Sequence, residues 1–252
     1  MTINEAKFEY YLRLGDSSLI LGHRISEWCG HGPILEEDIA LINVALDLVG
    51  QSRFMLDAAG KLENKGITED TLAYFRDANE YRNALLCEQP NGDFAMTIVR
   101  QFFYDTYHFL LLTELTKSKD ETLAAYAQKA IKEVSYHLRH SQDWMLRLGD
   151  GTAESNVRTQ NAVNELWMYT GDLFDMNEVD ALLIKEGIAV DLTIIKQGWA
   201  KKIKEVFDEA NLTTPENQYM QKGSKSGIHT EQLSYILAEM QSLPRSLPEA
   251  VW

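Results

Sequence analysis

The chain is poor in cysteine and has none of the long apolar runs that mark membrane proteins. Cys29 and Cys87 are its two cysteines among 252 residues, and their spacing fits neither a zinc site nor a disulfide framework. No segment approaches the roughly 20 consecutive apolar residues that a membrane-spanning helix needs. The N-terminal stretch shows no basic segment followed by an apolar run, so we expect no signal peptide. These absences predict a soluble, cytoplasmic protein with no membrane partner.

Positive charge is also scarce. Lys and Arg number 24 against 38 Asp and Glu, which gives a formal charge of -14. Such a balance argues against a nucleic acid or an anionic membrane as the main partner. The apolar share of 45% and the charged share of 25% are ordinary for a globular protein that buries a sizeable core.

Alternating β-branched runs are missing as well, whereas apolar residues recur at three- and four-residue spacing along most of the chain. We therefore expect an all-α fold, a ferritin-like four-helix bundle with additional C-terminal helices. A single domain is expected, with the bundle over 1–176 and accessory helices and a tail over 177–252. The predicted helices cover 5–28, 35–62, 94–116, 121–148, 156–174, 177–186, 191–210 and 229–243, with a short one near 68–75.

Two of these helices have stripes that we expect to face the core. In the helix over 121–148 the stripe contains, in order, Ala127, Ala130, Val134, His137, Ser141, Trp144 and Leu148. In the helix over 35–62 it contains Ile39, Ile42, Leu46, Val49, Arg53 and Leu56.

Four acids are predicted to share one layer of the bundle. The two helical hairpins turn near residues 31–33 and 118–119, so residues equally far from each turn lie at one height. Asp16 then pairs with Asp47, and Asp105 with Glu133. One acid from each of four helices is the skeleton of a carboxylate-bridged di-iron site.

The histidines that such a site also needs are not at the required positions. A di-iron bundle places a histidine three residues after the acid on two helices. Gly50 stands there after Asp47, and Tyr136 stands there after Glu133, with His137 one place later. Asp105 and His108 have the right spacing, but on a helix expected to give one acid only. We interpret Asp16, Asp47, Asp105, Glu133, His108, Tyr136 and His137 as a vestigial metal layer that has become a hydrogen-bonded polar core, with no metal and no catalytic residue in this chain.

A second candidate site lies in the loop before the last helix. Lys222, Lys225 and His229 stand beside Gly223 and Gly227, and backbone amides at the following helix start are available to a phosphate. No phosphate-binding loop pattern accompanies them, so a contact with a partner or a plain loop is the simpler interpretation.

Four long runs resemble a known family. They are LRLGDSSLILGHRISEWCGHGPILEEDIALINVALDLVGQSR (12–53), EQPNGDFAMTIVRQFFYD (88–105), KAIKEVSYHLRHSQDWMLRLGDGT (129–152) and GIHTEQLSYILAEMQSL (227–243). They are similar to the C-type subunits of bacterial phenylacetyl-CoA epoxidases over nearly the whole chain. EWCGH, EQPNGDF and the glycine-flanked HTE are the most specific motifs.

The resemblance implies a ferritin-like, non-catalytic subunit that supports a di-iron catalytic subunit in aerobic phenylacetate degradation. It implies no cofactor in this chain, iron in the partner catalytic subunit, and a hetero-oligomer with other epoxidase components. Two alternatives stay open: a self-sufficient di-iron carboxylate oxygenase or ferroxidase, and a module that binds a CoA ester through the Lys222 to His229 loop.

Overall fold

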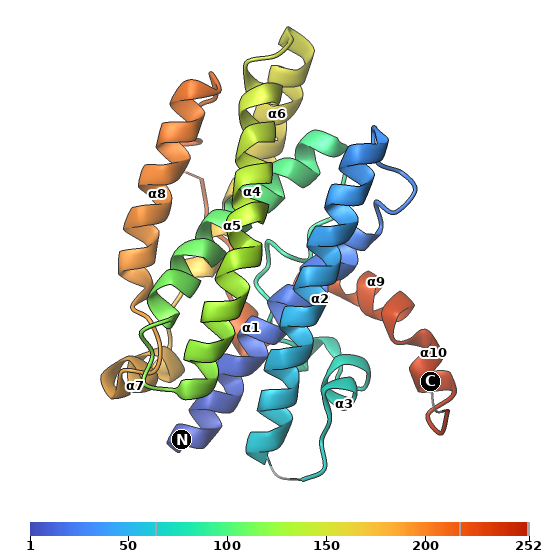
Figure 1. Ribbon diagram of the computed structural model, residues 1–252, viewed down its shortest axis with the longest axis vertical. Helices are drawn as coiled ribbons and strands as arrows, with labels where there is room; N and C mark the ends of the chain where they lie inside the picture. Colours follow the sequence, from blue (N-terminus) through green and yellow to red (C-terminus); the bar gives the residue numbers. More distant parts are fainter. Residues whose placement is uncertain (64, 217, 251–252) are drawn as a thin grey trace. The chain divides into compact units, whose positions relative to one another are not determined.

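The described residues of the computed structural model, 1–63, 65–216 and 218–250, are helical through most of their length and contain no strand (Figure 1). The α-helices are α1 (Ile3–Ser26), α2 (Leu35–Glu63), α3 (Glu69–Tyr74), α4 (Phe94–Leu115), α5 (Glu121–Gly149), α6 (Ala153–Leu166), α7 (Glu178–Glu186), α8 (Leu192–Glu209), α9 (Glu231–Met240) and α10 (Ser242–Ser246). Three 3₁₀ segments join them: η1 (Ala78–Glu80), η2 (Trp167–Phe174) and η3 (Ser224–Ser226). The all-α prediction is confirmed, and the fold is that expected of a ferritin-like bundle with extra C-terminal helices.

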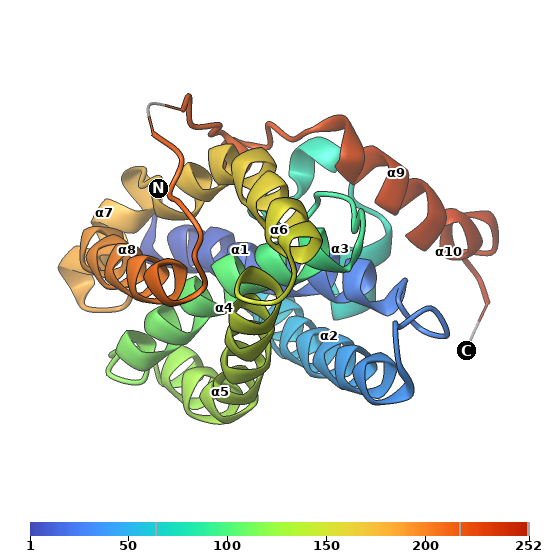
Figure 2. The ribbon, with the colours of Figure 1, turned by 90° about the horizontal axis from the view of Figure 1, so that it is seen from above.

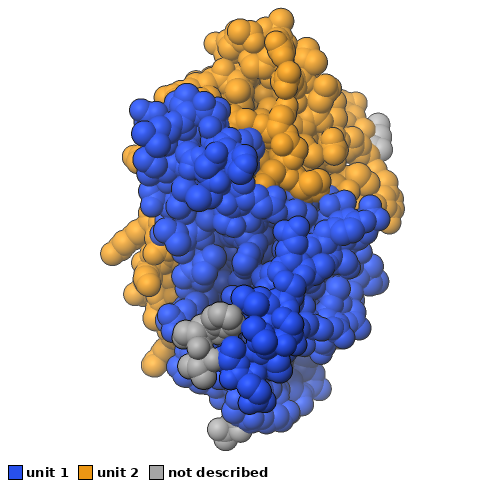
Figure 3. Space-filling view, turned by 90° about the vertical axis from the view of Figure 1, so that its right-hand side faces the viewer, with its two compact units in different colours: residues 1–89, 223–252 blue, residues 90–222 orange. Residues whose placement is uncertain are grey.

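The chain forms two compact units, coloured separately in Figure 3. Unit 1 combines residues 1–89 with 223–252, and unit 2 contains residues 90–222. These boundaries differ from the expected one at residue 176. The expectation of a single domain with its bundle over 1–176 stays a prediction.

Unit 1 is built on the α1–α2 hairpin, whose two helices lie side by side in both ribbon views (Figures 1 and 2). Gly15 allows α1 to approach α2 closely, because a Cβ atom there would stand 2.8 Å from a methyl carbon of Leu56. Helix α9 packs against α1 and η1 in the same unit. The C-terminal segment thus completes a core that begins at the N-terminus.

The predicted inner stripe of α2 is wrong. Ile39, Leu46 and Val49 are exposed, while the opposite side of the helix, including Leu41, Val44, Leu48 and Met55, is fully buried. The error arose because α2 is apolar on both sides, so that spacing alone does not distinguish the covered side from the open one.

Unit 2 contains the α4–α5 hairpin, with α6 and α8 packed on α4. Its aromatic core joins Phe103, Trp167, Trp199 and Phe207, and the Trp199 indole N–H donates to the Phe103 carbonyl over 2.9 Å. Phe102 and Phe103 are fully buried, as expected for aromatics that fill a core.

Most helix ends match the sequence signals. Thr68 caps α3, and Asp120 caps α5 by accepting from the Leu123 N–H. The stripe of α5 is buried as predicted through Ser141 and then moves by one residue to Met145. The helix predicted over 156–174 begins earlier, at Ala153, and changes to 3₁₀ geometry at Trp167.

Candidate functional site

A buried carboxylate, Asp105, is the centre of the polar cluster in unit 2. It lies on α4 with its side chain 1% exposed in the core between α4 and α5. Gln101, one turn earlier on α4, donates from Nε2 to Asp105 Oδ1 over 2.9 Å. Ser141 on α5 donates from Oγ to Asp105 Oδ2 over 2.8 Å. Both carboxylate oxygens therefore have neutral donors inside the unit.

Burial controls the electrostatics of this cluster. Loss of solvent raises the pKa of Asp105 from 3.8 to about 6, against the opposing effects of His137 and of the bonds from Ser141 and Gln101. Burial also lowers the pKa of His108 from 6.5 to about 3, and the charge of His137 lowers it further. His108 is thus a neutral imidazole near pH 7.

His108 and His137 both belong to the cluster. The His108 Nε2 atom lies 3.4 Å from the Tyr126 hydroxyl on α5, and its ring packs against Tyr104. Its Nδ1 atom is buried without a hydrogen-bond partner in the part of the chain that the structure describes. His137 is 1% exposed and faces Asp105 from α5.

The other predicted members from α5 lie outside this cluster. Glu133 is half-buried. Tyr136 is 40% exposed and stacks on the ring of His140, with ring planes 25° apart. The structure therefore brings Asp105, His108 and His137 together in one buried site and places Tyr136 at the surface.

In unit 1 the buried Asp16 of α1 is bound by an arginine that sequence reasoning missed. Arg76 donates from Nη1 to Asp16 Oδ2 over 3.0 Å and from Nη2 to Asp16 Oδ1, and the Arg82 backbone N–H adds a bond of 2.8 Å. Such a bidentate pair uses both carboxylate oxygens. Asp47, the predicted partner of Asp16, is only half-buried.

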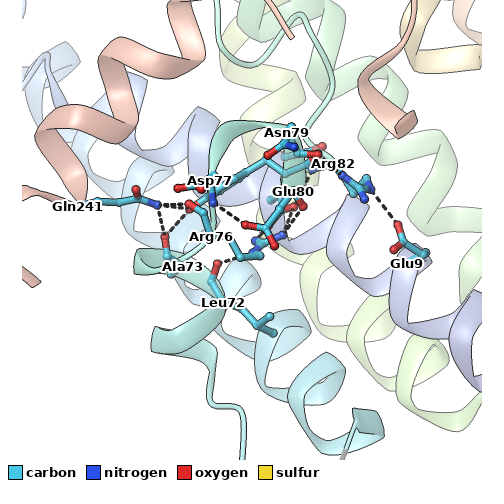
Figure 4. A network of polar contacts seen from close by, with 12 residues as sticks. Glu9, Leu72, Ala73, Arg76, Asp77, Asn79, Glu80, Arg82 and Gln241 are labelled. Carbon is cyan, nitrogen blue, oxygen red and sulfur yellow. Dashed lines mark hydrogen bonds and ion pairs between the residues drawn. The ribbon is translucent and has the colours of Figure 1, made fainter. Parts of the chain in front are cut away.

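The chain between α3 and η1 holds Arg76 in place (Figure 4). Its Nε donates to the Leu72 carbonyl over 2.6 Å, and its guanidinium lies 4.3 Å from the centre of the Tyr81 ring. From α9, Gln241 donates to the Arg76 carbonyl over 3.0 Å. The arginine is fixed by three separate segments of unit 1.

This donor set does not fit a carboxylate-bridged di-iron centre. An iron ligand needs free carboxylate oxygens, but those of Asp16 face a guanidinium, and those of Asp105 accept from Gln101 and Ser141. Among the described residues, no group of three or more His, Cys, Asp or Glu side chains is arranged to hold a metal ion. The expectation that this chain carries no iron stays a prediction.

The residues of the predicted ligand loop have separate partners. Lys222 lies in unit 2, where its Nζ pairs with Asp175 over 2.7 Å. Lys225 and His229 lie in unit 1. The Nδ1 atom of His229 is 2.9 Å from Glu88 Oε2, and its Nε2 atom is 3.0 Å from the Tyr81 carbonyl oxygen.

Glu88 forms a second buried carboxylate site in unit 1. Besides His229, it accepts from the Thr230 N–H over 2.6 Å, the Thr230 hydroxyl over 2.8 Å and Asn83 Nδ2 over 2.8 Å. Its side chain is fully buried. The sequence signal was the pair of motifs EQPNGDF and HTE, and the structure joins them: the Glu of the first binds the His and Thr of the second.

Comparisons with known proteins agree along the whole chain. A family model described as "Phenylacetic acid catabolic protein" matches residues 2–252. The chain is 50% identical to a protein of Escherichia coli (strain K12) that is named as the C-type subunit of 1,2-phenylacetyl-CoA epoxidase, over 96% of this chain and 98% of that one.

Proposed function

Because the chain belongs to the phenylacetic acid catabolic protein family, we propose that it is a structural subunit of a multicomponent phenylacetyl-CoA epoxidase. In this role it supports a di-iron catalytic subunit in aerobic phenylacetate degradation. The near-complete coverage of a protein named as one subunit of such an epoxidase supports assembly with other subunits rather than independent action.

One observation carries the non-catalytic part of this proposal. The best-buried acid of the predicted metal layer in unit 1, Asp16, is held by both nitrogens of a guanidinium. A carboxylate in that arrangement is stabilised as part of the core, and removing a partner from a buried pair is costly. Asp16 is thus suited to holding α1 and the α3–η1 segment together.

The remaining parts of the proposal concern location and cofactors. We propose that iron resides in the catalytic subunit, that this chain contributes none, and that the complex is cytoplasmic. The acidic balance of -14 favours a protein partner over nucleic acid.

Metal analysis tests this function directly. The isolated chain is expected to contain little iron and to show no epoxidation of phenylacetyl-CoA with dioxygen, NADPH and the reductase. The same chain, copurified with the catalytic subunit, is expected to show iron and turnover.

Stoichiometric iron in the isolated chain, lost in a Glu133→Ala variant, would instead identify a self-sufficient di-iron protein. The matched control is Glu239→Ala, which removes an exposed acid from α9.

A further inference from the structure

Helix α2 carries apolar side chains on two sides, and only one side is covered. Leu41, Val44, Leu48 and Met55 are buried. The other side presents a row that we name the α2 stripe: Leu35, 71% exposed, Ile39, 50%, Leu46, 64%, and Val49, 40%. These positions are four, seven and three residues apart, so they follow one line along the helix.

A glycine beside this row gives an independent indication of close contact. Gly50 is exposed in the middle of a 29-residue helix, and a Cβ atom built on it would meet nothing within 4 Å. Nothing around this position in the chain thus requires a glycine, although glycine inside a helix is unfavourable relative to alanine. A backbone that approaches from outside the chain would require it, as at small-residue helix contacts.

Charge around the α2 stripe distinguishes between possible occupants. Glu36 and Asp57 are acidic residues on exposed parts of α2 near the two ends of the stripe. A second copy packed antiparallel would bring Glu36 near Asp57 of its neighbour, and two chains of charge -14 repel each other. A partner helix with basic residues on its flanks has complementary charge.

A bilayer fits this surface less well. Helix α2 is the one helix among the described residues that is long and apolar enough to cross a membrane, yet half of that window is buried. The buried half packs against α1, and the acidic flanks oppose an anionic surface.

We propose that the α2 stripe, with Gly50, is the docking surface for an apolar helix with basic flanks on the catalytic subunit of the epoxidase. This inference rests on the proposed function, because it takes the occupant to be that subunit. It names the helix of this chain that makes the contact.

The test is binding of purified variants to the di-iron catalytic subunit of the same organism, measured by titration calorimetry. Leu46→Arg is expected to weaken binding at least about tenfold, because it buries an unpaired cation in an apolar contact. Val157→Arg is the matched control, since Val157 is a 57% exposed aliphatic residue on α6, and it is expected to bind as the wild type does.

Gly50→Ala adds a second readout that a purely structural role would not produce. It is expected to raise the thermal midpoint of the isolated chain, because alanine favours the helix. The same change is expected to weaken binding, because the methyl group prevents the close approach. Opposite signs for stability and binding support the proposal.

The outcomes separate the two hypotheses. If the wild-type chain does not bind the catalytic subunit, the proposed function fails. If the wild type binds and Leu46→Arg binds equally well, only the docking surface is wrong. The docking surface is also wrong in three other cases: the isolated Leu46→Arg variant loses thermal stability, it changes a wild-type dimer into a monomer, or the wild type binds phosphatidylcholine vesicles and the variant does not.

Discussion

Asp16 and Asp105 are both buried aspartates, but different partners stabilise their carboxylates. Asp16 is bound by the guanidinium of Arg76, so its charge is balanced inside unit 1. Asp105 accepts from an amide and a hydroxyl, which leaves the cost of burial visible in a pKa of about 6. The two residues therefore respond differently to substitution and to pH.

Replacing Asp105 by asparagine tests the raised pKa. A carboxyl whose pKa is higher in the folded state stabilises the fold at low pH, and this contribution is lost as the pH rises through about 6. Asparagine stays neutral at every pH. Relative to wild type, the free energy of unfolding of Asp105→Asn is expected to be about 2 kcal/mol more favourable at pH 8 than at pH 4.5, measured by urea titration.

His108 has the opposite pH dependence but does not disturb this comparison. Its pKa is lowered to about 3 by burial, so its contribution to stability is complete above pH 6.5 and is lost as the pH falls. Because both proteins contain His108, its effect cancels in the difference. A difference between Asp105→Asn and wild type that does not vary with pH would show that Asp105 titrates normally.

Replacing Arg76 by methionine tests the Asp16 pair. It leaves a buried carboxylate without its cation, which is expected to reduce the free energy of unfolding by about 3–5 kcal/mol. The control is Arg53→Met, since Arg53 pairs with Glu69 while its side chain is 77% exposed, and a change below about 1 kcal/mol is expected there. Equal effects of the two substitutions, measured by urea titration, would contradict a special role for Arg76.

Sequence reasoning identified the acids but not the partners that hold them. Asp16 and Asp105 stand on helices with clear periodicity, so counting from the turns located them. Arg76 and Glu88 lie in the irregular stretch after α2, where no periodic pattern indicates a direction for a side chain. Their contacts depend on tertiary packing over separations of 60 and 141 residues, to Asp16 and His229 respectively.

At the scale of helices, boundaries were predictable and covered faces were not always so. The N-caps Thr68 and Asp120 and the breaks at Gly and Pro fixed where helices begin and end. For α5, polar residues occupy one side, and the buried stripe was predicted correctly through Ser141. For α2, the apolar residues surround the helix, and the choice between sides required the packed structure.

The contact between Glu88 and the start of α9 predicts how that helix is held. Glu88→Ala removes an acceptor for four donors, three of them on His229 and Thr230, and leaves these groups buried without it. Amide hydrogen exchange in α9 is expected to become faster, while exchange in α5 stays unchanged. Mass spectrometry of peptides from both helices measures the difference.

Glu239→Ala is the control for this prediction, because Glu239 is an exposed acid on α9 itself. It is expected to leave exchange unaffected. If both variants exchange alike, Glu88 is not what holds α9.

At the scale of the whole chain, fold class and family followed from helical spacing and from the four long runs, whereas the division into units did not. The sequence showed a change of character near residue 176. The structure instead groups residues 1–89 with 223–252. Such a grouping depends on pairs like Glu88 and His229, whose separation in sequence hides their contact.

The discontinuity of unit 1 has a consequence for synthesis on the ribosome. Residues 90–222 leave the ribosome as one continuous stretch, so unit 2 has all its residues before unit 1 does. Until residues 223–252 are made, Glu88 lacks His229 and Thr230, and Arg76 lacks Gln241. The last helices to be translated therefore complete the first helices of the chain, and a nascent chain stopped at residue 222 would expose a core that only its own final segment is built to cover.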